Sequence, residues 1–174
     1  MIQSLIASRF KKYKPKTVAE AMQKCNVCAK FIGKGVFREV YRINHLPLVA
    51  KFPIRDSKAE IDVQHSQWEM QNIKWISRTK KFSSLWPHLP EFFHFDSRTG
   101  VSLMTEYEPL APVLDRYTVE FAELEKKLEL IDYGPLDVDQ VGIDETDTLI
   151  CLDFGHIGDQ RRWWDKEGRF CLDR

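Results

Sequence analysis

Asp153 is the residue of this chain whose type and setting are best suited to holding a metal ion. It follows the apolar run 149–152, which we expect to be a buried strand, and it precedes Phe154 and Gly155. A carboxylate at the end of a strand, beside a glycine that frees the backbone, suits a hard cation such as Mg²⁺. The tripeptide Asp-Phe-Gly arises by chance in many chains. The sequence upstream must therefore supply the other parts of a phosphate site.

Two glycines and a lysine upstream are candidates for those parts. Gly33 and Gly35 interrupt the segment 31–43, whose pattern predicts a strand, a turn and a second strand. Glycines spaced in this way let the backbone approach a phosphate and offer its N–H groups, although an ordinary hairpin turn is the alternative. Lys51 lies inside the apolar segment 47–52, a predicted third strand. A buried ammonium group needs an acidic partner or a phosphate.

Further elements must position these residues. Glu69, Ile73 and Ile76 fall on one face of a helix predicted over 59–76. Segments 91–95 and 101–107 predict a hairpin, and apolar residues at helical spacing predict a helix over 117–131. Near the start of the chain, Thr17 and Glu20 form a capping box that predicts a short helix from 18 to 24.

The composition limits the classes of function. The 174 residues are 43% hydrophobic and 30% charged, as in a globular protein. Lys+Arg 26 balances Asp+Glu 26, so bulk charge does not indicate a nucleic-acid partner. Apolar runs are far shorter than the ~20 residues of a membrane span. No signal peptide is evident, so we expect a cytoplasmic protein without a membrane partner.

Two sets of residues have structural interpretations that compete with functional ones. Cys25 and Cys28 have the spacing of half a zinc site, but no second pair follows, and we favour ordinary thiols. Cys151 is expected to be a core residue. The basic run at 11–16 and the cluster 161–164 (Arg-Arg-Trp-Trp) could contact a partner. We favour a solvated face for the basic run 11–16. For the cluster 161–164 we favour side chains that cover an apolar edge.

The strands and helices predicted between residues 31 and 158 together resemble the protein-kinase fold. Gly33-Lys34-Gly35, Val40-Tyr41 and Val49-Ala50-Lys51 look like its glycine-rich loop and lysine strand, with Arg38 in place of a third glycine. The resemblance implies that Glu69 pairs with Lys51, that Thr105 flanks an adenine pocket and that the backbone around Glu106 pairs with the base. It also implies that Asp153 holds Mg²⁺ and that Gly33, Gly35, Val40, Lys51 and Glu69 form the ATP site.

The catalytic loop departs from the family pattern. Val141-Gly142-Ile143 aligns with the strand after the metal-binding asparagine, which puts Gln140 at the asparagine position and Pro135 at that of the catalytic aspartate. Gln140 can offer an amide oxygen to a metal, but proline cannot act as an acid or base. Asp137 or Asp139 could replace the base in a shorter loop. We favour the interpretation that Asp137 and Asp139 are solvent-exposed aspartates of a turn.

We therefore expect an α+β protein with a reduced bilobal kinase-like fold, similar to compact kinase-like proteins of bacteria and phages. Its parts are an N-terminal helical extension (1–28), an N-lobe with a five-stranded antiparallel sheet and one helix (29–110), and a minimal helical C-lobe (111–174). The resemblance implies binding of ATP and Mg²⁺ and phosphoryl transfer to a protein substrate, with Asp137 as base. The alternatives are a pseudokinase that binds a protein partner and a small-molecule phosphotransferase. We expect the nineteen residues after Gly155 to be too few for a substrate platform.

Overall fold

The computed structural model describes residues 2–54, 59–155 and 157, and it divides into two compact units. Unit 1 comprises the described residues up to Trp68 together with Pro90–Tyr107. Unit 2 comprises Glu69–Leu89 and the described residues from Glu108 onward, so the division falls within one helix. The cluster 161–164 and Cys171 lie outside the described residues.

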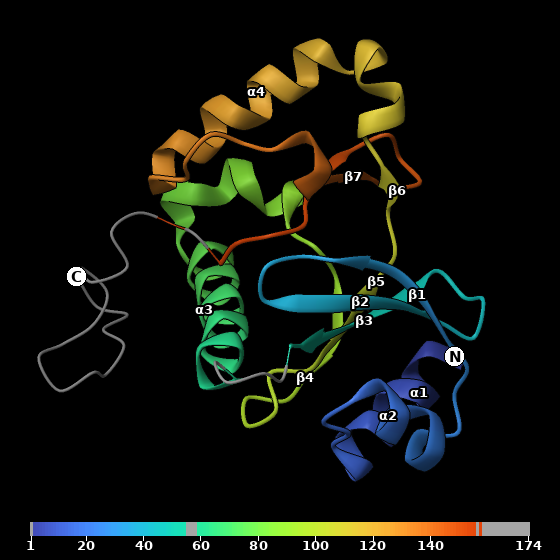
Figure 1. The fold of residues 1–174 in the computed structure, drawn as a ribbon. Coiled ribbons are helices and arrows are strands. Elements are labelled where there is room, and N and C mark those ends of the chain that lie inside the picture. Colours follow the sequence, from blue (N-terminus) through green and yellow to red (C-terminus); the bar gives the residue numbers. More distant parts are fainter. Residues whose placement is uncertain (1, 55–58, 156, 158–174) are drawn as a thin grey trace, which may run out of the picture. The chain divides into compact units, whose positions relative to one another are not determined.

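Unit 1 contains two short N-terminal helices and a five-stranded antiparallel sheet in the order β1-β2-β3-β5-β4 (Figure 1). The expected α+β class and the five-stranded sheet are therefore confirmed. The elements of this unit, with the first part of α3, are α1 (Ile2–Tyr13), α2 (Val18–Cys25), β1 (Ala29–Lys34), β2 (Arg38–Ile43), β3 (Leu48–Pro53), α3 (Ala59–Arg78), β4 (Phe92–Phe95) and β5 (Ser102–Thr105).

Helices α1 and α2 share their hydrophobic core with one face of this sheet. Ile6 and Phe10 of α1 are almost fully buried against strand residues that include Leu48, Ala50 and Phe52. Alternation along β3 turns Val49 and Lys51 to the opposite face. The predicted cap of α2 is present, because the Thr17 side chain accepts a hydrogen bond from the Glu20 N–H. The extension 1–28 is thus part of the core of unit 1.

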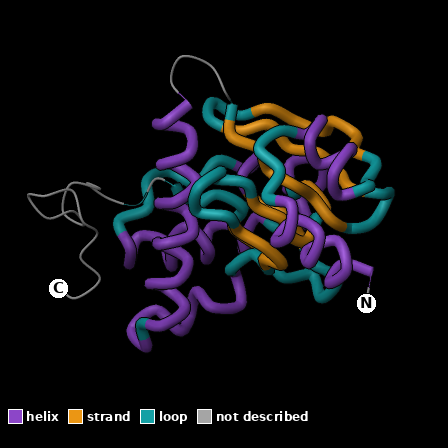
Figure 2. Tube along the Cα trace, turned by 90° about the horizontal axis from the view of Figure 1, so that it is seen from below, coloured by secondary structure: helices purple, strands orange, loops and turns teal. Residues whose placement is uncertain are grey.

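Unit 2 contains the second part of α3, a further α-helix, several short 3₁₀ helices and a small antiparallel sheet in the order β6-β7-β8. The strands are orange and the helices purple in Figure 2. Strand β6 was not predicted, because a two-residue strand that contains a proline has no periodic pattern. The further elements are the 3₁₀ helices η1 (Lys80–His88), η2 (Ala111–Arg116), η3 (Glu129–Ile131) and η4 (Val138–Gln140), the α-helix α4 (Thr118–Leu128), and the strands β6 (Glu108–Pro109), β7 (Val141–Ile143) and β8 (Leu149–Cys151).

The residues of β7 and β8 are all buried, as the apolar run before Asp153 predicted. Antiparallel pairing of Val141 with Cys151 and of Ile143 with Leu149 makes the two strands a hairpin. Cys151 is fully buried, which confirms its expected packing role. This hairpin brings Gln140, directly before β7, to the end of β8, where the Leu152 N–H donates to the Gln140 carbonyl oxygen over 2.7 Å.

None of the helices in the described ranges combines the length and the apolar character that crossing a membrane requires.

Candidate nucleotide site

In unit 1, four strands place a glycine, a valine, a lysine and a serine in one row. Gly33 pairs with Val40, Val40 with Lys51, and Lys51 with Ser102. Direct partners in a sheet project to the same face, so this row lies on the face opposite to α1 and α2. Lys51 is only 7% exposed and Ser102 only 2%. Ser102 was missed in the sequence, because only the register of β3 against β5 identifies it as a neighbour of Lys51.

The two glycines of the β1–β2 hairpin are not required by the packing of the protein. A Cβ added to Gly33 meets no heavy atom within 4 Å, and one added to Gly35 meets only the Arg38 carbonyl oxygen at 3.9 Å. Neither residue has a positive φ. The Gly35 N–H donates to the Arg38 carbonyl oxygen over 2.8 Å, so it closes the turn. What Gly33 contributes is open space at one end of the row that contains Lys51.

Glu106 follows β5 and is held from two directions within unit 1. The Nε of Arg42 donates to both carboxylate oxygens of Glu106 over 2.8 and 2.7 Å, and Nη2 adds a third contact. The Glu106 N–H donates to the Pro47 carbonyl oxygen over 3.1 Å. Thr105 also has a partner, because its hydroxyl donates to the Glu91 carboxylate over 2.8 Å. The expected pairing of this backbone with a base stays a prediction.

In unit 2, the turn at Asp153–Gly155 is fixed by three hydrogen bonds, two from other segments and one within the turn. The Tyr133 hydroxyl donates to the Asp153 carbonyl oxygen over 2.6 Å. The Asn72 side-chain amide of α3 donates to the Phe154 carbonyl oxygen, also over 2.6 Å. The Gly155 N–H donates to Oδ1 of Asp153 over 2.8 Å, which orients the carboxylate. The turn is therefore held by one buried and two part-buried hydrogen bonds.

Tyr133 also lies beside Gln140, the second expected metal ligand. Its Oη is 3.2 Å from Oε1 of Gln140 and 2.6 Å from the Asp153 carbonyl oxygen. A hydroxyl has one proton to donate. The shorter contact shows that the main acceptor is the Asp153 carbonyl oxygen. Tyr133 was not identified from the sequence, because a contact across twenty residues between a loop and a turn leaves no spacing pattern.

Burial dominates the electrostatics around this turn. It raises the pKa of Tyr133 far above its ordinary value, and nearby Cys151, Asp153 and Glu69 raise it further. Burial also raises the pKa of the Cys151 thiol to about 12. Tyr133 is therefore a neutral hydrogen-bond donor at physiological pH. Glu69 is 1% exposed and acts on the pKa of both residues, which places it in the same cluster.

The residues near Asp153 have the right chemistry for Mg²⁺, but they do not form a complete cage. Asp153 and Gln140 offer a carboxylate and an amide oxygen. Among the described residues there is no group of three or more His, Cys, Asp or Glu side chains that could hold a metal. Mg²⁺ is commonly held by one or two carboxylates together with phosphate oxygens of a substrate. The set therefore fits a metal that arrives with a nucleotide.

Asp137, the expected base, caps a turn. It precedes η4, and its Oδ1 accepts a hydrogen bond from the Asp139 N–H over 3.0 Å. Both residues are exposed, as is Pro135. This contact is the one that a turn-forming aspartate makes. A catalytic role for Asp137 stays a prediction.

The expected site residues thus fall into two local sets. Unit 1 brings Gly33, Val40 and Lys51 together, and unit 2 brings together Glu69, Gln140 and Asp153. The predicted pairing of Lys51 with Glu69 joins the two units and stays a prediction. Comparison of the sequence with models of protein families finds no match, and comparison with the curated proteins finds none either.

Proposed function

We propose that this chain binds ATP together with Mg²⁺ as a reduced protein-kinase-like protein. The observation that carries the proposal is the turn at Asp153. Its two carbonyl groups are hydrogen-bonded by Tyr133 and Asn72, and its carboxylate is oriented by Gly155. A fixed carboxylate at the end of a buried hairpin is what a metal ligand requires, since disorder in a ligand weakens binding.

The row that contains Lys51 supports the same proposal. A buried ammonium group is costly unless an anion compensates it, and phosphate oxygens can do so. In the proposed complex, Lys51 holds the α- and β-phosphates, Glu69 positions Lys51, and the hairpin at Gly33–Gly35 covers the phosphates. Asp153 and Gln140 hold the metal, whose charge stabilises the phosphates. The backbone near Glu106 contacts the base.

Thermal melting with and without Mg²⁺ and ATP tests the binding. A ligand at 100 times its Kd stabilises the folded protein by about 2.7 kcal/mol. We expect this shift in the native chain and its loss in Lys51→Ala and Asp153→Ala. Lys30→Ala, which removes an exposed lysine of β1, is the matched control and should keep the shift. A native chain that shows no shift would refute the nucleotide proposal and leave a protein-binding module.

Gly33→Val tests the role of the open space. The added side chain has room in the protein, so the variant should melt at or above the native temperature in the absence of nucleotide. If a nucleotide occupies the space beside Lys51, the same side chain should reduce the shift caused by ATP. An unchanged shift would remove this hairpin from the proposed site.

Binding without catalysis is the second candidate, and one observation favours it. The carboxylate of Asp137 already caps η4, and Pro135 has no group that can accept a proton. The chain then acts as a pseudokinase that regulates a partner. Transfer of radiolabelled phosphate to the chain itself or to candidate proteins distinguishes the two functions. Loss of transfer in Asp137→Asn with ATP binding intact would support Asp137 as base, and unchanged transfer would exclude it.

A further inference from the structure

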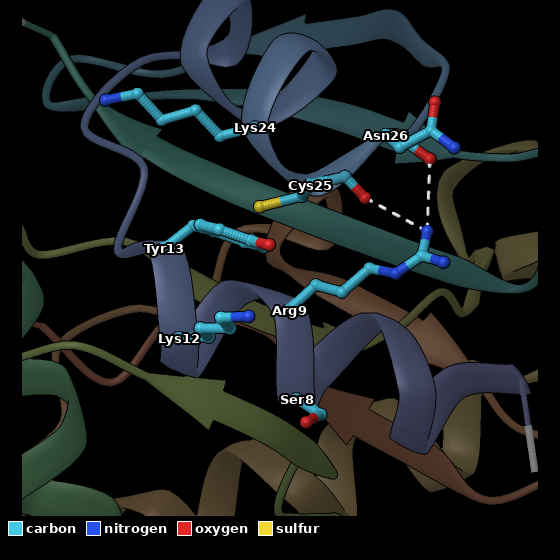
Figure 3. Close-up of a pocket in the computed structure, with 7 residues that line it drawn as sticks. All are labelled: Ser8, Arg9, Lys12, Tyr13, Lys24, Cys25 and Asn26. Atoms are coloured by element: carbon cyan, nitrogen blue, oxygen red, sulfur yellow. Dashed lines mark hydrogen bonds between the residues drawn. The ribbon is translucent and has the colours of Figure 1, made fainter.

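A cationic pocket lies between the two N-terminal helices, within unit 1. It has a volume of about 350 Å³ and is lined by Arg9, Lys12 and Tyr13 of α1 and by Lys24 and Asn26 at the end of α2. Figure 3 shows the side chains of both helices around the same hollow. This volume is at the lower end of the range for small-molecule sites. None of the residues expected in the nucleotide site contributes to it.

Arg9 is held in place with part of its guanidinium group unused. Its Nη1 donates to the Cys25 carbonyl oxygen over 3.1 Å and to the Asn26 carbonyl oxygen over 3.4 Å, as the dashed lines in Figure 3 show. Within the described part of the chain, Nε and Nη2 have no hydrogen-bond partner. These two atoms form the edge with which arginine binds carboxylate or phosphate through two parallel hydrogen bonds. Anchoring by Nη1 therefore pre-organises the free edge for an anion.

The segment that forms the pocket has a net positive charge. Residues 1–28 contain six Lys and Arg residues and one acidic residue, Glu20. Glu20 pairs with Lys24 over 3.3 Å. In the described structure, Lys12 has no carboxylate partner, and its ammonium group lies 5.0 Å from the centre of the Tyr13 ring. Burial raises the pKa of the Cys25 thiol, so this part of the wall is neutral.

A phosphate monoester matches these features better than a carboxylate. It carries two charges, and its oxygens can accept hydrogen bonds from the Arg9 edge while Lys12 supplies further positive charge. Exposed apolar side chains also lie on the two helices that form the pocket. Leu5, one turn before Arg9 on the same face of α1, is 53% exposed, and Met22 of α2 is 46% exposed. Apolar neighbours suit the side chains of a peptide rather than a run of nucleic-acid phosphates.

We propose that the pocket between α1 and α2 binds a phosphorylated serine or threonine in a peptide segment of a partner protein. Arg9 binds two phosphate oxygens, Lys12 supplies a further positive charge, and Leu5 and Met22 contact the residues that flank the phosphate. Recognition of phosphate by clustered cations beside an apolar surface is an established mode of peptide binding. The proposal is independent of the nucleotide site.

Fluorescence anisotropy with a labelled phosphoserine peptide flanked by leucines, titrated with the full chain, tests this proposal. Lys12→Gln and Lys11→Gln form a matched pair. They remove the same charge from neighbouring positions, but only Lys12 lines the pocket. Since charge-assisted hydrogen bonds are the strong ones, we expect Lys12→Gln and Arg9→Lys each to raise Kd by about tenfold. Lys11→Gln should change Kd by less than about twofold, an effect of long-range charge alone.

Several results would overturn the proposal. The phosphorylated and unphosphorylated peptides could bind equally or not at all, or the two glutamine variants could have equal effects. Displacement of the peptide by single-stranded RNA, with the same dependence on Arg9 and Lys12, would overturn the choice of a peptide. Inorganic phosphate should compete only weakly, because it lacks the flanking contacts. Lys12 makes no hydrogen bond in the described structure, so its variant tests binding without loss of the fold, which a thermal melt verifies.

Discussion

Removal of the Tyr133 hydroxyl is the most direct test of how the Asp153 turn is held. Tyr133→Phe keeps the ring, which lies edge-on to Phe154 with centroids 6.1 Å apart. It removes the donor that lies 2.6 Å from the Asp153 carbonyl oxygen. Leaving a part-buried carbonyl without its donor lowers the free energy of unfolding by about 1–3 kcal/mol. At about 2–4 °C per kcal/mol, the melting temperature should fall by roughly 2–12 °C.

Tyr117→Phe is the matched control within the same unit. The Tyr117 hydroxyl donates to Oδ1 of Asp147 over 2.8 Å, but this contact is exposed to solvent. Its loss should change the free energy of unfolding by no more than about 0.5 kcal/mol. Urea unfolding followed by tryptophan fluorescence measures both variants. The reasoning is refuted if Tyr133→Phe is no less stable than Tyr117→Phe.

The raised pKa of Tyr133 adds an alkaline signature to the same test. Because the folded protein keeps the phenol protonated more strongly than the unfolded chain does, this residue's contribution is fully present below about pH 10. It is lost progressively as the pH rises above that value. Tyr133→Phe should therefore lose less stability than the native chain does between pH 9 and pH 11, after the effect of Tyr117 has been measured separately. Equal losses would contradict the burial of the phenol.

Three further variants test other parts of the structure. Asn72→Ala removes the donor to the Phe154 carbonyl oxygen at a site that is 4% exposed, so urea unfolding should show a loss of about 1–3 kcal/mol, and an unchanged midpoint would contradict the contact. Gly100→Ala should cost about 2 kcal/mol or more, because Gly100 has φ +70° and a Cβ would lie 2.8 Å from Cγ of Pro53; a melting temperature within 1 °C of the native value would contradict this backbone. Burial lowers the pKa of His88, so its contribution to stability is present above about pH 6.5 and is lost as the pH falls below that value. His88→Asn should weaken the dependence of the melting temperature on pH between 7.5 and 5. An identical dependence in the variant and the native chain would contradict this role of His88.

The His88 prediction follows from contacts that require a neutral ring. Nδ1 lies 2.7 Å from the Leu149 carbonyl oxygen, so it carries the proton, and Nε2 lies 2.9 Å from the Lys127 ammonium group, so it accepts. Protonation of Nε2 would place two cations in contact. Nearby Lys127 lowers the pKa further, whereas the bond to Leu149 acts in the opposite direction.

Local patterns in the sequence predicted most elements. The helical spacing from Glu69 to Ile76 and the capping box at Thr17 both correspond to observed helices, since each depends on residues within one or two turns. The apolar run before Asp153 is a buried strand for the same reason. Strand β6 has no such pattern, because its two residues form a strand only through pairing with Ile143 and Gly142.

The candidate site was less accessible from the sequence than the fold. The types of Lys51 and Asp153 indicated phosphate and metal chemistry, but not which residues support them. Tyr133, Asn72 and Ser102 make their contacts across 20, 82 and about fifty residues of chain, and no spacing rule covers such distances. Asp137 illustrates the opposite case, because a turn-forming role was favoured from local sequence and its side chain does cap η4.

The pairing of β3 with β5 has a consequence for synthesis of the chain. Strand β3 has six buried residues, and its second neighbour in the sheet begins only at Ser102. At about 5–20 residues per second, the roughly fifty intervening residues take about 3–10 seconds to synthesise. During that time one edge of an apolar strand is available to other nascent chains. Chaperones should be recovered with ribosomes stalled after β3 has emerged but before β5 has emerged, and not with ribosomes stalled after β5 has emerged.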